Sequence, residues 1–257
     1  MSRVVLDPAP WIEGLPRDGR GFVVPAESSW VDGVPVLKET TPFRNVALMA
    51  RRGCAVCGFE LAHGDPVFRV FTEAVETKGD AQAGEVGEVV GDVETIRLNR
   101  GAVDRDVPMH LSCALYSAQV CPYLSVPTAK LSSGNSHLPD HVRGGAAVFG
   151  FEKFGLLVSA ADGFIDFGTE GLKVAYLGLV KDIPYVNGGD VADLYAAAVV
   201  SDSAVIDTSG KRCFWSDSVQ DRGERDRAVE AAEWVVGGSA PARVVDFGGV
   251  AYKLFHF

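Results

Sequence analysis

Cys54-Ala-Val-Cys57 and His110-Leu-Ser-Cys113 are the two stretches that decide how the first half of this chain folds. Each stretch places two metal-ligating side chains three positions apart. A Cys-x2-Cys turn directs both sulfur atoms to one point, and two residues three apart on a helix lie on the same face. Four thiolate or imidazole ligands form the tetrahedral set of a structural zinc site. We therefore predict that these four residues bind one structural Zn²⁺ ion.

The residues beside the two stretches agree with this prediction. Gly58 suits the turned backbone after the first cysteine pair, because such turns often need a positive φ. Pro108 predicts a helix over residues 109–120, whose first turn would carry the second ligand pair. The free N–H groups at a helix N-terminus favour a thiolate over a thiol. A catalytic zinc keeps one position open, so four protein ligands indicate a structural ion.

Other interpretations of these residues stay open at the level of sequence. One is that the cysteines are reduced, buried thiols and that His110 is unrelated to them. Another concerns Cys121, which lies eight residues after Cys113, about 12 Å along a continuous helix. Cys121 would replace His110 as a ligand only if the helix ended early. The remaining cysteine, Cys213, is interpreted as a packing residue.

Residues 1–125 are predicted to form the zinc-binding domain. Thr41 and Pro42 are typical of a helix start and Gly53 of a helix end, which predicts a helix directly before the first ligand. Farther out we expect strands at residues 21–24, 35–39, 66–71 and 94–99, with a mobile acidic loop at residues 74–93.

Residues 139–257 are predicted to form a second domain, connected to the first through a linker at residues 123–143. A helix over residues 225–236 should bury one apolar face. That face would consist of Ala228, Ala231, Trp234 and Val235. The other expected elements are strands at residues 146–160, 164–168 and 173–180, a helix at 190–200 and a hairpin at 243–257. The predicted fold class is α+β, with a zinc unit in the N-terminal half and a mixed α+β C-terminal half.

Composition indicates a folded chain with a sizeable core. The chain has 257 residues, 47% of them hydrophobic, and a formal net charge of −10, which argues against broad binding to nucleic-acid phosphates. Its first residues, MSRVVLDPAP, lack the apolar segment of a secretory signal. No apolar run reaches the roughly 18 residues of a membrane span. We therefore expect a cytoplasmic protein without membrane contact.

The turn that carries Cys54 and Cys57, here called the knuckle, is followed by a predicted hairpin and by a helix with the last two ligands in its first turn. This order resembles the treble-clef group of zinc fingers. The resemblance covers residues 50–121, and the stretch between the ligand pairs, residues 58–109, is long for this group. It implies a structural zinc ion. The phrases CAVCGFEL and PMHLSCALYSAQVCPYL are also similar to proteins of actinobacteria and their phages, a likeness that implies no activity.

Three basic residues before the knuckle are candidates for contact with nucleic acid: Arg44, Arg51 and Arg52. Residues 1–58 carry 7 Lys+Arg and 6 Asp+Glu (7 − 6 = +1), so this segment is not acidic like the rest of the chain. Arg51 and Arg52 are expected beside the zinc, where phosphate contact is one interpretation. A solvated helix face is the interpretation that we favour.

His63, at the predicted hairpin turn, is the candidate for an alternative, catalytic function. Nucleases of the His-metal-finger type carry a catalytic histidine on a treble-clef-like hairpin. This sequence departs from that pattern, since it lacks the Asp-His pair and the Asn or His partner in the helix. His137 and His141 are four residues apart, which on a helix would be the spacing of a metal-binding pair, but Pro139 lies between them. The carboxylates of Asp166, Glu170, Asp190 and Asp193 are interpreted as helix caps or solvated surface.

The sequence thus predicts a zinc-stabilised binding or interaction protein that is not an enzyme. Its partner would be a protein or a nucleic acid, and the acidity of the larger part favours a protein. A regulatory or phage-related role is a further interpretation. The competing hypothesis is a metal-dependent nuclease on the same scaffold.

Overall fold

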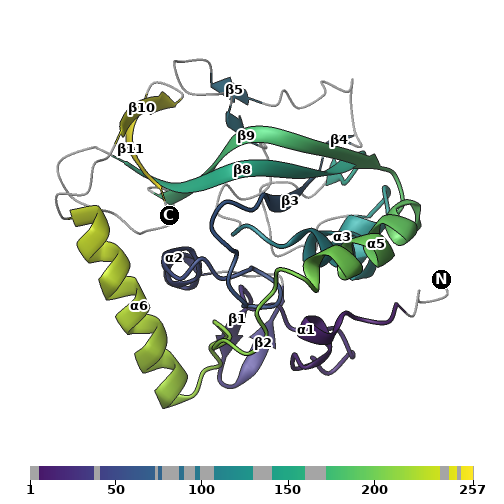
Figure 1. Cartoon of the computed structure of the whole chain (residues 1–257), viewed down its shortest axis with the longest axis horizontal. Helices are drawn as coiled ribbons and strands as arrows, with labels where there is room; N and C mark the ends of the chain where they lie inside the picture. The colour runs from purple at the N-terminus through teal and green to yellow at the C-terminus, as the bar shows by residue number, and fades with distance from the viewer. Residues whose placement is uncertain are drawn as a thin grey trace.

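A five-stranded antiparallel sheet forms the centre of the fold (Figure 1). In this computed structural model, β8 (Ala146–Ser159) pairs along its length with β9 (Leu172–Tyr185). The other edge of β8 is shared, because β3 (Val67–Thr72) pairs with its first half and β11 (Val250–His256) with its second half. β10 (Arg243–Phe247) forms a hairpin with β11. The structure describes residues 6–37, 41–72, 75–76, 87–89, 96–98, 107–129, 141–159, 172–237, 243–247 and 250–256.

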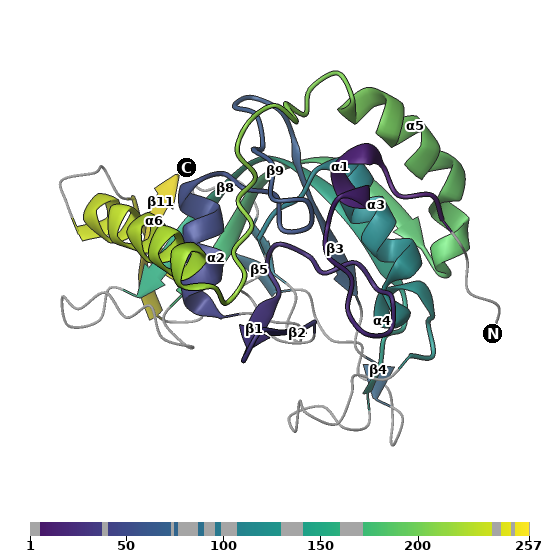
Figure 2. The ribbon, with the colours of Figure 1, turned by 90° about the horizontal axis from the view of Figure 1, so that it is seen from below.

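Helices pack against one face of this sheet. α3 (Leu111–Val120) contacts β3 and β8, and α5 (Ala192–Asp202) packs on α3. α2 (Pro42–Ala50) packs against α6 (Val219–Gly237), which runs along the outside of the molecule (Figure 1). The chain between α5 and α6 crosses the middle of the molecule (Figure 2).

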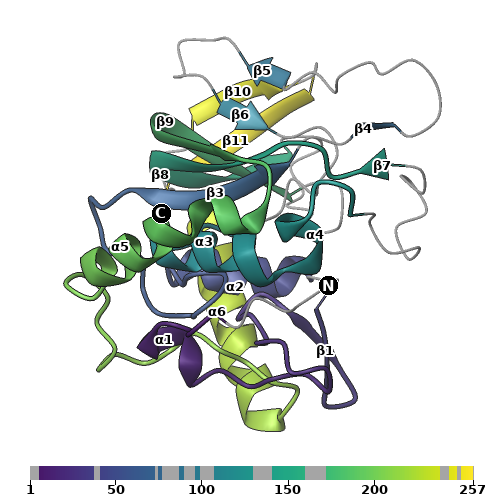
Figure 3. The ribbon, with the colours of Figure 1, turned by 90° about the vertical axis from the view of Figure 1, so that its right-hand side faces the viewer.

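Short elements complete the described part of the chain. They are α1 (Pro10–Glu13), β1 (Ser29–Val31), β2 (Val34–Val36), β4 (Val75–Glu76), β5 (Gly87–Val89), β6 (Ile96–Leu98), α4 (Pro122–Ser125), β7 (His141–Val142) and the 3-10 helix η2 (Gly188–Val191). In Figure 3, α3, α4 and α5 lie beneath the sheet, while β5 and β6 lie above it. α3 is therefore enclosed between the sheet and α5, and the second predicted pair of metal ligands, His110 and Cys113, lies at its N-terminus.

Most predicted elements are present, with shifted bounds. The helix expected at residues 190–200 is observed as η2 followed by α5. The helix expected at residues 225–236 begins earlier, at Val219. The strand expected at residues 21–24 is wrong, because this segment forms only a single bridge, between Arg17 and Val23. The strand expected at residues 164–168 and most of the acidic loop lie outside the described residues.

The apolar face predicted for the last helix is wrong at one position. Ala228 and Ala232 are buried in α6, whereas Ala231 is exposed. The contact with α2 selects the buried face, and the sequence alone did not specify which neighbour the helix would have. The side chains of Trp234 and Val235 lie outside the described residues.

Contacts join the two predicted halves of the chain. β3 from the first half pairs with β8 from the second, and α2 packs against α6. The α+β class is confirmed, while the division into residues 1–125 and 139–257 stays a prediction. Within the described residues, no helix combines the length and the apolar character needed to cross a membrane.

Candidate metal centre

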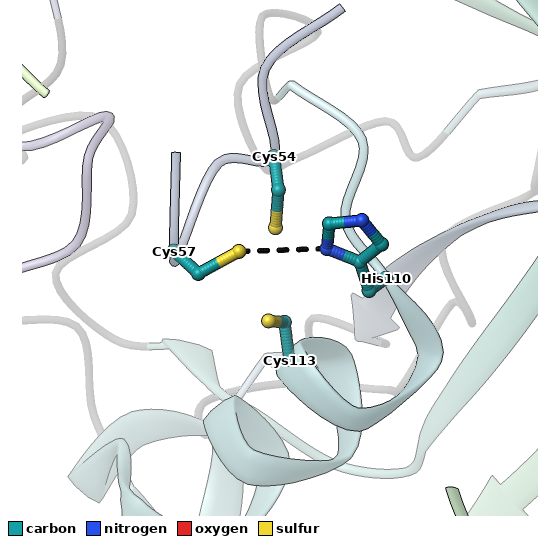
Figure 4. Close-up of side chains that lie close together, drawn as sticks. All are labelled: Cys54, Cys57, His110 and Cys113. Atoms are coloured by element: carbon teal, nitrogen blue, oxygen red, sulfur yellow. Dashed lines mark hydrogen bonds between the residues drawn. The ribbon is translucent and has the colours of Figure 1, made fainter. Parts of the chain in front are cut away.

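The side chains of Cys54, Cys57, His110 and Cys113 converge on one point (Figure 4). Their ligand atoms all lie within 4.8 Å of one another, and Cys57 Sγ is 3.5 Å from His110 Nδ1. A tetrahedral zinc ion holds such atoms about 3.5–3.8 Å apart, so closing around an ion requires a contraction of no more than about 1 Å. The three cysteines are 0% exposed and the histidine 7%. The arrangement therefore fits a buried metal ion with four protein ligands.

A tight turn presents the first ligand pair. The Gly58 N–H donates to the Cys54 carbonyl at 2.9 Å, and the Cys54 N–H donates to the Phe59 carbonyl at 2.9 Å. Gly58 has φ +72°, as predicted from its place after the pair. A bridge between Gly53 and Glu60 closes the base of the turn. These backbone contacts direct both sulfur atoms to the same side.

The second ligand pair is held by the segment that leads into α3. Met109 exchanges two backbone hydrogen bonds with Phe68 of β3, at 2.8 and 2.9 Å, and the Ala55 N–H donates to the Pro108 carbonyl at 3.0 Å. His110 is the residue directly before α3, and Cys113 lies in its first turn. The ion would therefore connect the knuckle to the N-terminus of a buried helix.

The second nitrogen of His110 fixes the orientation of the ring. His110 Nε2 lies 3.0 Å from the Glu60 carbonyl oxygen, which can only accept a hydrogen bond. Nε2 therefore carries the proton, and in the neutral ring Nδ1 presents its lone pair toward the three sulfur atoms. A histidine that ligates a metal commonly donates its other N–H in this way. This contact favours His110, rather than Cys121, as the fourth ligand.

Burial and the mutual charges and hydrogen bonds of the four ligand residues shift their pKa values in different directions. Burial lowers the pKa of His110, but the charges of Cys54 and Cys57 and the hydrogen bonds to them together outweigh burial and raise it to about 11. Burial raises the pKa of Cys54, whereas hydrogen bonds from Cys113 and Cys57 and the charge of His110 hold it well below its usual value. Burial raises the pKa of both Cys57 and Cys113. A divalent cation binds these groups as thiolates and a neutral imidazole, so its binding would displace the protons that they hold.

Asp202 is a supporting residue that the sequence did not reveal. Its Oδ2 atom accepts a hydrogen bond from the Ser112 backbone N–H at 2.8 Å, inside the first turn of α3. His110, in the N-cap position, makes no side-chain cap, so this carboxylate from the end of α5 takes that role. Ninety residues separate donor and acceptor, and no local signal could have predicted the contact.

The three arginines proposed for nucleic-acid contact have different surroundings. Arg44 is 2% exposed and donates to the Trp215 carbonyl. Arg52 is partly buried, donates to the Leu61 and Ala62 carbonyls at 2.9 and 3.2 Å, and lies over a phenylalanine ring. Arg51 alone of the three is exposed. Contact with nucleic acid stays a prediction, with Arg51 as the accessible residue.

The other residues considered from the sequence lie apart from the four ligands. Cys121 directly follows α3, and all five cysteines are free, with no disulfide. Cys213 lies against the outside of the knuckle, where its N–H donates to the Gly58 carbonyl at 2.7 Å. His63 is exposed in the turn before β3. Asp190 caps η2 and Asp193 is exposed on α5, as predicted, whereas His137, Asp166 and Glu170 lie outside the described residues.

A shallow cavity of about 400 Å³ lies beside the metal cluster. Its lining includes His110, Phe68, Val180, Asp202 and Val205 and does not include His63. In the part of the chain that the structure describes, the four-residue cluster is the one group of His, Cys, Asp and Glu side chains arranged to hold a metal ion. Compared with protein-family models, curated proteins and solved structures, the chain matches none.

Proposed function

We propose that this chain is a zinc-stabilised binding protein and that its zinc unit is of the treble-clef type. The order of its parts supports the second statement. The knuckle is followed by β3, then by the bridge of Phe68 with Met109, and then by α3 with a ligand in its first turn. Three sulfur ligands and one imidazole are the set that zinc prefers over magnesium or calcium, which favour oxygen ligands.

The observation that supports a structural rather than a catalytic role is that the four protein ligands would fill the coordination sphere of the ion. Four protein ligands are available and all four are buried, so a tetrahedral ion has no position left for water or substrate. The ion instead connects the knuckle to α3, and its binding free energy becomes folding free energy. A non-catalytic role follows for this metal centre.

A protein partner is the better supported of the two classes of partner. The chain carries a formal net charge of −10, which opposes binding to phosphates. Arg44 is buried, and the Arg52 guanidinium already donates to two carbonyls. Only Arg51 remains as an exposed cation among the three candidates. A nucleic-acid contact would then depend on this one side chain, and a single exposed cation attracts the phosphates of a nucleic acid only weakly.

Metal analysis tests the proposal. Mass spectrometry of the purified chain should find one zinc per molecule, and Cys54→Ser and His110→Ala should lose it. Cys121→Ser is the matched control, because this free cysteine is outside the cluster and should keep the full zinc content. Cobalt substitution of the wild type should give the absorption of a tetrahedral thiolate site. A wild-type chain that binds no zinc would overturn the proposal.

A nuclease assay separates the proposal from its catalytic alternative. The binding function predicts that plasmid DNA incubated with the zinc-loaded chain and Mg²⁺ or Mn²⁺ stays intact. Cleavage that requires a divalent ion and disappears in His63→Ala would establish the nuclease instead. Anisotropy of labelled duplex DNA should likewise show no salt-dependent binding, and tight binding lost in Arg51→Ala would replace the protein partner with DNA.

A further inference from the structure

The segment of residues 211–215, here called the strap, lies across the outer side of the metal knuckle. It belongs to the connection between α5 and α6 that crosses the middle of the molecule (Figure 2). The Cys213 N–H donates to the Gly58 carbonyl at 2.7 Å, so the strap adds a backbone hydrogen bond to the knuckle itself. In the sequence, Cys213 of the strap comes 100 residues after Cys113, the last of the four metal ligands (213 − 113 = 100).

Two glycines allow this close approach. A Cβ atom placed on Gly58 would lie 2.5 Å from the Cys213 carbonyl oxygen and 3.0 Å from Arg212 Cγ. A Cβ atom placed on Gly53 would lie 3.1 Å from Cys213 Cβ. Gly53 and Gly58 enclose the first ligand pair in the sequence. The strap therefore contacts the backbone on both sides of the knuckle.

Side chains of the strap extend the contact to the N-terminal region. Arg212 donates to the Trp11 carbonyl at 3.0 Å, and its guanidinium lies 4.6 Å from the centre of the Phe59 ring, two residues after Cys57. Phe214 packs edge-on against Trp30 at 6.2 Å. Arg212 therefore joins the N-terminal region, through its hydrogen bond to Trp11, to the knuckle, through its cation–π contact with Phe59.

α6 depends on the same knuckle through two connections. The strap leads into α6, and the carbonyl of Trp215 accepts a hydrogen bond from Arg44 of α2. α2 is the helix against which α6 packs, and it ends at the knuckle, where the Gly53 N–H donates to the Leu48 carbonyl at 2.8 Å. Both supports of α6 therefore end at the turn that carries the first two ligands.

We propose that occupancy of the metal site controls whether the strap and α6 stay docked, a regulation that rests on the metal site of the proposed function. The bound ion holds the knuckle in the one backbone arrangement that presents the Gly58 carbonyl to Cys213. When the ion is lost, the backbone of the knuckle is no longer held in this arrangement. The hydrogen bond between Cys213 and Gly58 is then broken, and the contact of Arg212 with the Phe59 ring is weakened. The strap then detaches and α6 loses its hold on α2. Coupling between two sites is reciprocal, so weakening the strap weakens metal binding by the same factor.

The central sheet should persist when the ion is removed. Its largest aromatic contacts are made between strands of the sheet itself, where Phe151 and Tyr176 lie 5.0 Å apart and Phe71 packs on both rings. β8 and β9 are each fourteen residues long and pair along their lengths. Release is therefore expected to be local, confined to the strap, α6 and the knuckle.

Amide hydrogen exchange of the full chain tests the control, with zinc content measured on the same samples. Removing zinc with a chelator should speed exchange of peptides from the strap and α6 at least about 10-fold, while peptides from β8 and β9 stay protected. Zinc bound with unchanged strap exchange would overturn the inference and leave the zinc proposal intact. Uniform loss of protection across the chain would also overturn it. A chain that binds no zinc would overturn both.

A pair of neighbouring variants tests the coupling in the opposite direction. Arg212→Ala removes the contacts with Trp11 and Phe59 and should weaken zinc affinity about 5-fold in competition with a chromophoric chelator. Lys211→Ala removes the same charge one residue earlier, where the side chain is 76% exposed and pairs only with Glu224 in the described structure. It should change the affinity by less than about 2-fold, because exposed ion pairs contribute little. Equal affinities for both variants and the wild type would contradict the coupling.

Discussion

Substituting Gly58 measures how closely the strap is pressed against the metal knuckle. Gly58 has φ +72°, where an L-residue costs about 1–2 kcal/mol. The added Cβ would also lie 2.5 Å from the Cys213 carbonyl oxygen, about 1 Å closer than an ordinary contact. A backbone carbonyl has no rotamer by which to move aside, so the strap must shift and the Cys213–Gly58 hydrogen bond is lost. Overpacking and the lost bond add about 2–3 kcal/mol, so Gly58→Ala should cost about 3–5 kcal/mol.

Gly33→Ala separates the contact from the backbone strain. Gly33 has φ +76°, close to that of Gly58, but nothing lies within 4 Å of its added Cβ. This variant should lose only the strain, about 1–2 kcal/mol. Urea unfolding of the zinc-loaded proteins measures both losses, and the difference of about 2–3 kcal/mol is the contribution of the strap contact. Equal losses for the two variants would refute the claim that the strap rests on Gly58.

Three further predictions concern the metal and the ends of helices. Zinc binding should release protons near pH 7, because the ligands bind as thiolates and a neutral imidazole, and it should therefore weaken as the pH falls. Calorimetry in buffers of different ionisation enthalpy would detect the release, and binding without proton release would contradict this reasoning. Asp202→Ala should lower the unfolding free energy by about 1 kcal/mol through loss of the cap on α3. Asp193→Ala, in the exposed first turn of α5, should cost no more than about 0.5 kcal/mol, and urea unfolding distinguishes the two. The hydrogen bond from the Ser216 hydroxyl lowers the pKa of Asp221 below 3.8, so the stability that this carboxylate contributes is present above pH 3.8 and is lost as the pH falls through the lower folded pKa. The difference in unfolding free energy between wild type and Asp221→Asn should therefore shrink over that range. A difference that persists there would show that the carboxylate is not the acceptor.

The metal cluster was predictable because its information is local. Each ligand pair lies within four residues, so the turn and the first helical turn fix the geometry within each pair. Gly58 was likewise predictable, since a turn of this kind requires a positive φ wherever the rest of the chain goes. The helix after Pro108 followed from local signals as well and differs from its prediction by two residues at its start.

The contacts that hold the cluster in place were not predictable for the opposite reason. Asp202 contacts Ser112 from 90 residues away and Cys213 contacts Gly58 from 155 residues away (213 − 58 = 155), and nothing near them in the sequence indicates a target. Arg44 shows the same limit. As a charged residue in the first turn of α2 it suggested an exposed contact with phosphate, but the strap and α6 cover that side of the helix. Burial imposed by distant segments overrode the local expectation.

The strap also has a consequence for how the chain folds during its synthesis. The last metal ligand, Cys113, leaves the ribosome 100 residues before Cys213 (213 − 113 = 100). At about 5–20 residues per second, the nascent chain spends roughly 5–20 s with all four ligands made and the outer side of the knuckle still uncovered. During this interval the Gly58 carbonyl and the Phe59 ring are open to solvent and to other proteins. Metal delivery and any cotranslational helper therefore meet a surface that the finished protein no longer displays.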